Sequence, residues 1–201
     1  MDQARTAEIS RATGETSVTL SLSIDGTGTS QVDTGVAPLD HFLALFARHG
    51  VFDLAITARG DLAVDAHHTV EDVAICLGQA VRQSLGDHTG IRRTADFSVP
   101  MDESLAHVAV DLGGRGYFVQ RVRFVDGSVG MLQTDLVRHF LETFALEARM
   151  NLHIVDLYGS NAHHQVEAVF KALGRALDAA TQHDARIEGR LPSTKEHIEG
   201  A

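Results

Sequence analysis

Two short stretches of this sequence place adjacent histidines before a glutamate three residues further on. They contain His67, His68 and Glu71, and then His163, His164 and Glu167. Imidazole and carboxylate groups without a thiolate suit manganese, iron, cobalt, nickel or zinc. On a helix, residues three or four apart share a face, whereas adjacent residues diverge by about 100°. We therefore expect His68 and Glu71 to share one ion, and His67 to serve a second ion or a site in another subunit.

Both stretches belong to longer segments that occur twice in the chain. Residues 66–81 read AHHTVEDVAICLGQAV and residues 162–177 read AHHQVEAVFKALGRAL, an offset of 96. Upstream, residues 41–56 read HFLALFARHGVFDLAI and residues 139–154 read HFLETFALEARMNLHI, an offset of 98. Two matched blocks in the same order indicate an internal duplication. The duplicated positions predict eight metal ligands, which are His41, His67, His68, Glu71, His139, His163, His164 and Glu167.

The hydrophobic pattern predicts matching elements around both copies. Alternating apolar residues predict a strand in each half, and the turn signals that follow predict a hairpin with a second strand. These strands are expected at residues 18–24 and 29–33, and at residues 108–112 and 117–124. The other expected elements are helices at residues 39–48 and 132–149, short strands at residues 54–56 and 152–154, and longer helices that begin at the two AHH motifs.

Each half is therefore predicted to have the order β-β-α-β-α. The halves are expected at residues 1–95 and 96–201, and together they would form one compact unit. The expected fold class is α+β, with helices that cover one face of mostly antiparallel sheets.

Composition narrows the class of protein. The 201 residues include 27 acidic and 17 basic side chains, a net charge of −10, which argues against nucleic-acid or anionic-membrane partners. The N-terminal residues lack the apolar stretch of a signal peptide, and no segment approaches the roughly 20 apolar residues of a membrane span. Cys76 lies among apolar residues of an expected helix and is predicted to be a core residue. We expect a cytoplasmic globular protein.

The motifs together resemble one enzyme family. They read LDHFLALFARHG, DAHHTVED, MDESLAHVAVDLGGR, NAHHQVEAVFKALGRAL and LPSTK, and they are similar to those of imidazoleglycerol-phosphate dehydratases over nearly the whole chain. This resemblance implies dehydration of imidazole glycerol phosphate to imidazole acetol phosphate in histidine biosynthesis. It also implies two manganese ions per active site and a 24-subunit homo-oligomer built from trimers. Each half would have a fold similar to the second domain of ribosomal protein S5.

The resemblance also implies roles for individual residues. It implies that the eight duplicated histidines and glutamates are the manganese ligands. The substrate pocket would be lined by Glu15, His49, Asp102 and Lys171. The phosphate would be held by Arg93, Arg115, Ser193, Thr194 and Lys195. The last group agrees with physical chemistry, because an acidic protein must supply cations locally to bind a phosphate.

The chemistry of this dehydration indicates which groups are needed. The proton that is removed lies on a carbon that no carbonyl activates, so two metals on the ring nitrogens would stabilise an imidazolate. Hydroxide would then leave, and a positioned base would remove the neighbouring proton. We expect Glu15 to be this acid–base group, because the resemblance places it in the pocket and not among the ligands. Glu167, His49 and Lys171 are candidate relays.

Two other hypotheses remain open from the sequence alone. The duplicated sites could belong to a structural or storage protein in which metal only holds an oligomer together, or to a dinuclear metal hydrolase. Arg93, Arg115 and Lys195 favour an enzyme, because a purely structural metal site needs no phosphate clamp. Four positions depart from the family pattern. Phe42 replaces a usual methionine, Leu45 replaces a usual glutamine near the pocket, Gly116 replaces a common proline, and Glu196 replaces a frequent glycine after LPSTK.

Overall fold

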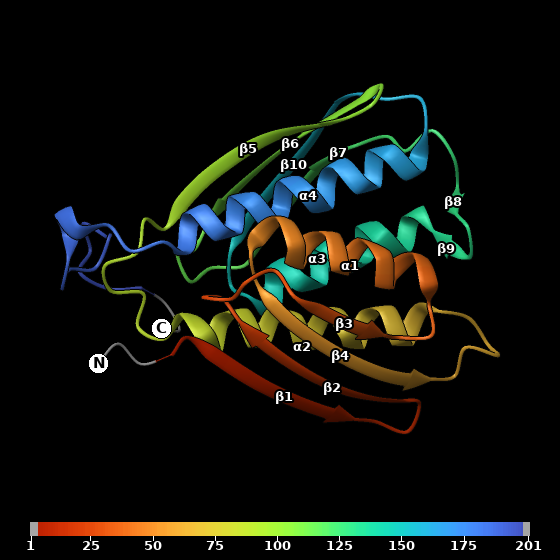
Figure 1. Ribbon diagram of the computed structural model, residues 1–201, viewed down its shortest axis with the longest axis horizontal. Helices are drawn as coiled ribbons and strands as arrows, with labels where there is room; N and C mark the ends of the chain where they lie inside the picture. The colour runs from red at the N-terminus through yellow and green to blue at the C-terminus, as the bar shows by residue number, and fades with distance from the viewer. Residues whose placement is uncertain (1–3, 199–201) are drawn as a thin grey trace.

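The computed structural model describes residues 4–198, which form four layers (Figure 1). Two four-stranded sheets lie on the outside, and the four long helices lie between them (Figure 1). The first sheet has the order β1-β2-β4-β3 and the second the order β5-β6-β10-β7. The α+β fold class is therefore confirmed. No helix of the described range combines the length and apolar character needed to cross a membrane.

The order of elements repeats between the two halves. The first half contains β1 (Thr6–Ala12), β2 (Thr16–Ser23), β3 (Ser30–Asp33), α1 (Ala37–Gly50), β4 (Asp53–Gly60) and α2 (His67–Leu85). The second half contains β5 (Thr94–Met101), β6 (Ser104–Asp111), β7 (Tyr117–Arg121), α3 (Thr134–Glu147), β10 (Asn151–Tyr158) and α4 (Ala162–Thr181). A small ribbon of β8 (Ser128–Val129) and β9 (Leu132–Gln133) precedes α3, and a 3₁₀ helix follows α4 at Ala185–Ile187.

The four-stranded sheet of each half has one strand more than the sequence pattern predicted. The additional strands, β1 and β5, are both edge strands of their sheets. Their apolar signal is weak because β1 turns Arg11 toward α2, where Nε bonds the buried carboxylate of Asp72 at 2.7 Å, while β5 contains Pro100. The division expected between residues 95 and 96 falls inside β5.

The prediction of a hairpin in each half is wrong, because β2 does not pair with β3 and β6 does not pair with β7. In the first sheet β4 lies between β2 and β3, antiparallel to β2 and parallel to β3. The second sheet repeats this arrangement, with β10 antiparallel to β6 and parallel to β7. The reason is visible after Asp25-Gly26, where Asp53 at the start of β4 accepts hydrogen bonds from the N–H groups of Thr27 and Thr29. The loop is thus tied to β4 and does not form a tight turn back onto β2.

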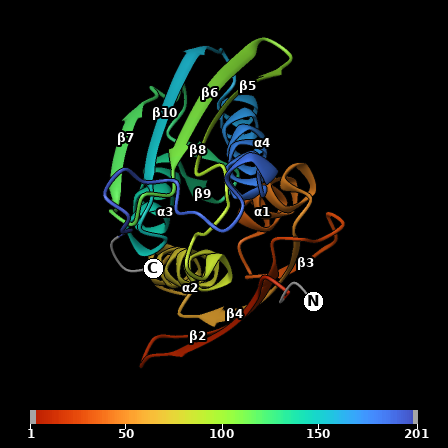
Figure 2. The ribbon, with the colours of Figure 1, turned by 90° about the vertical axis from the view of Figure 1, so that its left-hand side faces the viewer.

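Each helix pair in the interior joins one helix from the first half to one helix from the second. Helix α1 of the first half packs on α4 of the second, and α3 of the second half packs on α2 of the first (Figure 2). Buried phenylalanines fill the contact, with ring centroids 5.5 Å apart for Phe42 and Phe170 and 6.1 Å apart for Phe46 and Phe144. This packing places residues of α1 beside residues of α4, although they are far apart in the sequence. Cys76, also fully buried, belongs to the same core, as predicted.

Candidate active site

One cluster of potential metal ligands lies where α1 crosses α4. Nε2 of His41, from α1, is 3.5 Å from Oε2 of Glu167, and Nε2 of His163 is 3.3 Å from the same oxygen. These three side chains offer ligand atoms that all lie within 4.8 Å of one another. Two imidazoles and one carboxylate at this spacing fit a divalent transition metal.

A second cluster lies where α3 crosses α2, and it repeats the first. Nε2 of His139, from α3, is 3.2 Å from Oε1 of Glu71, and its ring centroid is 4.9 Å from that of His67. The expectation that His68 shares an ion with Glu71 is therefore wrong, because His67 occupies that position. Helical side chains lean toward the N-terminus, so Glu71 reaches the residue four positions earlier.

The second histidine of each pair points into a separate group, as the divergence of adjacent residues predicts. Nδ1 of His68 lies 3.0 Å from Oδ2 of Asp61 and 3.7 Å from Oε2 of Glu15. Nδ1 of His164 lies 2.7 Å from Oε2 of Glu103, while its Nε2 is 4.0 Å from Asp102. The hydrogen bond from His164 lowers the pKa of Glu103 to about 2. Among the described residues, two clusters thus join two histidines to one glutamate, and two further groups each join one histidine to two carboxylates from outside its helix.

The surroundings of the two crossing points differ. Nζ of Lys171, one turn beyond Glu167, is 2.5 Å from Oε1 of that glutamate. The equivalent residue of α2 is Ile75, which offers no charge. Burial opposes the charged form of Glu167, but the hydrogen bond and charge of Lys171 prevail and lower the pKa of this carboxyl. His49 is near Lys171 and Arg175, and burial together with these two charges lowers its pKa. The α1–α4 crossing therefore has a lysine beside its glutamate, whereas the α2–α3 crossing has Ile75 at the equivalent position.

The residues expected to hold a phosphate converge on one pocket of about 300 Å³, lined by Arg93, Gly113, Arg115, Pro192, Ser193, Thr194, Lys195 and His197. Arg93 is fixed there by Asp111, with N–O distances of 2.6 and 3.0 Å, and by the carbonyl of Pro192 at 2.8 Å. Three cations and a hydroxyl group around one hollow form an anion site. Glu196 is not among the lining residues, and its φ of 51° explains why glycine is frequent at this position.

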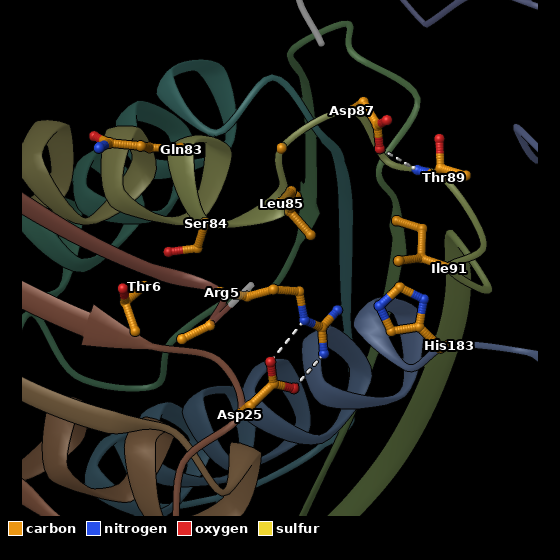
Figure 3. A pocket seen from close by; sticks show the side chains of 12 residues that line it. Arg5, Thr6, Asp25, Gln83, Ser84, Leu85, Asp87, Thr89, Ile91 and His183 are labelled. Atoms are coloured by element: carbon orange, nitrogen blue, oxygen red, sulfur yellow. Dashed lines mark hydrogen bonds and ion pairs between the residues drawn. The ribbon is translucent and has the colours of Figure 1, made fainter. Parts of the chain in front are cut away.

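A larger hollow of about 780 Å³ lies by the C-terminal end of α2 (Figure 3). Its charged groups are already paired. The guanidinium of Arg5 bonds both oxygens of Asp25 and the carbonyl of Thr181, and Asp87 accepts the N–H of Thr89 (Figure 3). Volume alone therefore does not identify a candidate phosphate site, because the smaller pocket is the one lined by Arg93, Arg115 and Lys195.

Sequence reasoning missed two residues of these groups, Asp61 and Glu103. Neither follows the repeat offsets that revealed the ligands, so the duplication gave no signal for them. Glu103 could have been found from its position, because it directly precedes β6 as Glu15 directly precedes β2. Leu45, where the family usually has glutamine, is partly buried against the core.

The fold and the histidine clusters define a class: an internally duplicated α+β protein with candidate His/Glu metal centres and a separate anion pocket. The family model of imidazoleglycerol-phosphate dehydratase matches residues 34–177. An imidazoleglycerol-phosphate dehydratase from Chloroflexus aggregans is 58% identical over 195 residues, which cover 97% of this chain and 95% of the relative.

Two solved structures have the same fold. The crystal structure of imidazoleglycerol-phosphate dehydratase from Staphylococcus aureus matches with a TM-score of 0.81 and 35% identity over 89% of this chain and 99% of that one. The enzyme from Pyrococcus furiosus, in complex with (S)-C348, matches with a TM-score of 0.82 and 35% identity over 94% of this chain and 100% of that one. The chain belongs to the imidazoleglycerol-phosphate dehydratase family, and it is a hydro-lyase of histidine biosynthesis.

Proposed function

We propose that this chain dehydrates imidazole glycerol phosphate to imidazole acetol phosphate with two manganese ions in each active site. The observation that carries this proposal is the combination of two duplicated His–His–Glu clusters with a basic pocket in one chain of this family. The clusters suit an imidazole ring that must be activated through its nitrogens. The basic pocket suits the phosphate at the other end of the same substrate.

The metals would be held by the duplicated residues. His41, His163 and Glu167 would contribute to one site, and His67, Glu71 and His139 to another. These donors are imidazole nitrogens and carboxylate oxygens, the set that manganese accepts, and three donors leave coordination positions for further ligands. His68 and His164, which point away from both clusters, would complete sites shared with other copies of the chain. When bound, manganese would act as a Lewis acid toward the imidazole ring of the substrate.

Side chains near the clusters would move the protons. Glu15 would act as the acid–base group, because its carboxylate lies at the metal-binding end of the chain and 3.7 Å from His68. The lowered pKa of His49 keeps its imidazole neutral near pH 7, so this group can accept a proton. Lys171 would hold the carboxylate of Glu167 in place through its 2.5 Å contact and supply a positive charge to the pocket. Asp102, beside His164, would line the same pocket.

The phosphate would bind between Arg93, Arg115 and the segment Ser193–Lys195. Guanidinium groups match phosphate oxygens in a bidentate manner, and Lys195 adds a third positive charge. Asp111 neutralises part of the charge on Arg93 but also holds its guanidinium in one orientation. The pocket would therefore bind the phosphate with little loss of side-chain freedom.

The distance between the two ends of the molecule supports an oligomer in which two copies share each active site. The backbone N–H of Arg93 bonds the carbonyl of Ala180 near the end of α4, whereas His163 lies at the start of that helix. At 1.5 Å per residue these points are about 25 Å apart. A small substrate cannot reach both, so the phosphate pocket of one chain must serve the metals of another. We propose that this arrangement is the 24-subunit assembly of trimers that the family resemblance implies.

The proposal is tested with purified protein, imidazole glycerol phosphate and manganese. Chelation should abolish formation of imidazole acetol phosphate, and added Mn²⁺ should restore it. A fully metal-free protein that keeps its activity would contradict the metal mechanism, while no turnover under any metal condition would contradict the proposed substrate. A cytoplasmic location stays a prediction of the sequence.

A further inference from the structure

His68 and His164 occupy equivalent positions on α2 and α4, and both are held in the same manner. Nδ1 of His68 faces Oδ2 of Asp61 at 3.0 Å, and Nδ1 of His164 faces Oε2 of Glu103 at 2.7 Å. An ionised carboxylate can only accept a hydrogen bond, so the proton of each ring must lie on Nδ1. In the neutral form of each ring, which is the form that binds metal, Nε2 then has its lone pair free. In both complete clusters the histidines that contact a glutamate also use Nε2.

The two carboxylates come from different places in the repeat. Asp61 directly follows β4, whereas the residue that directly follows β10 is Gly159, which offers no carboxylate. Glu103 directly precedes β6, and the equivalent residue directly before β2 is Glu15. In the second half, Glu103 therefore holds His164 directly. In the first half, Asp61 makes the equivalent contact to His68, and Glu15 lies 3.7 Å from that histidine.

Glu103 is itself held by further hydrogen bonds, whereas the side chain of Asp61 has no hydrogen bond among the described residues besides the one to His68. Oε1 of Glu103 accepts hydrogen bonds from the hydroxyl of Ser104 at 3.0 Å and from the N–H of Ser160 at 3.4 Å. The side chain of Asp61 is 26% exposed, and its Oδ1 is buried without a hydrogen-bond partner among the described residues. Each carboxylate thus has one oxygen committed to the histidine.

We propose that Asp61 and Glu103 are positioning residues, each of which fixes the tautomer and orientation of its histidine so that Nε2 can bind metal, and that Asp61 also leaves Glu15 free for proton transfer. Such outer hydrogen bonds orient metal-binding imidazoles and raise their basicity. Glu15 and Glu103 occupy equivalent turns of the two halves, but only the first half has Asp61 to hold its histidine. Glu15 is therefore available for proton transfer, whereas Glu103 positions His164. This inference rests on the proposed metal sites.

The first test measures Mn²⁺ affinity and does not depend on turnover. Free Mn²⁺ is titrated by its electron paramagnetic resonance signal in the assembled wild type and in Asp61→Ala and Glu103→Ala. Glu103→Ala should bind Mn²⁺ about 10- to 100-fold more weakly. Asp61→Ala should also bind Mn²⁺ more weakly, but by about 10-fold at most, because Glu15, 3.7 Å from His68, can partly replace the lost carboxylate. Asp61→Asn and Glu103→Gln should keep most of the affinity, because an amide oxygen still accepts the Nδ1 proton.

A matched control comes from the outer face of the second sheet. There Asp96 lies 3.9 Å from His107, so Asp96→Ala also removes a carboxylate beside a histidine, and it should leave the Mn²⁺ affinity unchanged. Circular dichroism of each variant separates loss of folding from loss of affinity. Wild-type Mn²⁺ affinity in folded Asp61→Ala and Glu103→Ala would overturn the proposal. A wild type that binds no Mn²⁺ would instead overturn the proposed function.

The second test separates the two carboxylates at saturating Mn²⁺. Glu103→Ala should recover most of its kcat, because only histidine orientation is lost. Asp61→Ala should keep a lowered kcat with little change in KM, because His68 then draws Glu15 into the vacated hydrogen bond. Equal recovery of kcat by both variants would overturn the special role of Asp61.

Discussion

At the scale of single residues, adjacent histidines do different work because the helix separates them. His67 and His163 each join a glutamate four residues later, and His68 and His164 each meet a carboxylate from outside the helix. Glu15 lies in the same group as Asp61 and His68, but at 3.7 Å from His68 it does not make the short contact that Asp61 makes. In the proposed mechanism, proton transfer and metal binding would therefore depend on neighbouring but distinct side chains.

The variant Glu15→Gln tests the proton-transfer role. The amide has the size of the carboxylate but cannot carry a proton between substrate and solvent, so kcat should fall by about 10²- to 10⁴-fold. Mn²⁺ binding and the size of the assembly should not change, which elemental analysis and light scattering would verify. Near-normal turnover in this variant would remove Glu15 from the mechanism.

A histidine outside the clusters should affect stability through pH. His88 is 3% exposed, and Nδ1 is 3.1 Å from the carbonyl of Leu112. Burial lowers the pKa of His88, whereas the unfolded chain has an ordinary value of about 6.5. Between these values the unfolded state binds the proton more readily, so stability is present above about pH 6.5 and is lost as the pH falls further.

The variant His88→Asn isolates this effect. Asparagine tolerates the φ of 61° at this position and can donate a hydrogen bond, but it does not titrate. We expect Tm to fall less between pH 7 and pH 5 in the variant than in the wild type, both with saturating Mn²⁺. Parallel Tm curves for the two proteins would contradict the prediction.

At the scale of elements, the helix contacts between the two halves depend on a duplicated glycine. Gly78 of α2 faces the backbone of α3, and Gly174 of α4 faces the backbone of α1. A Cβ at position 174 would lie 2.5 Å from the carbonyl oxygen of Phe46 and 3.0 Å from the nitrogen of Gly50. These glycines let the helices approach closely, and this approach brings His41 to His163 and His139 to His67.

In the variant Gly174→Ala, the higher helix propensity of alanine favours folding, whereas the clash of its Cβ with α1 opposes folding. Alanine favours a helix over glycine by about 1 kcal/mol, but the clash with backbone costs about 1–3 kcal/mol or more. We expect a lower Tm and weaker Mn²⁺ binding, measured by circular dichroism and by titration. Gly127→Ala is the control, because a Cβ there meets no atom within 4 Å and should leave both measurements unchanged. A stabilised Gly174→Ala would show that the helices are not in close contact.

At the scale of the whole molecule, the metal clusters and the phosphate pocket lie at opposite ends of α4. The segment that follows α4 lies beyond its C-terminal end, away from the start of the helix (Figure 1). If both parts act on one substrate, as proposed, they must come from different copies of the chain.

Mixed oligomers test this arrangement. Glu15→Gln and Arg115→Ala chains, each inactive as pure assemblies, should regain activity when they assemble together. Random mixing would give up to about a quarter of sites with both intact residues, since each comes from a different copy. Arg115→Ala mixed with Lys195→Ala is the control, because both residues line the same pocket and cannot complement. Absence of recovery in the first mixture would mean that one chain supplies both residues.

The sequence by itself determined the duplication, the α+β class and the residues that form the clusters. These follow from local signals: repeated motifs, apolar periodicity, and ligand types at helical spacing. The elements with weak apolar signals, β1 and β5, were not visible, and neither was the placement of β4 between β2 and β3. Strand pairing depends on contacts between distant residues, such as Asp53 with Thr27 and Thr29.

Only the tertiary structure decided how the ligands are combined. His41 meets Glu167 because α1 packs on the helix of the other half, and no spacing within one repeat contains that information. Asp61 and Glu103 reach equivalent histidines from unequal positions, so the repeat could not reveal them. The residue types set which chemistry is available. The packing of the two halves determines which side chains act together, because contacts between different helices and strands depend on distances that only the folded chain defines.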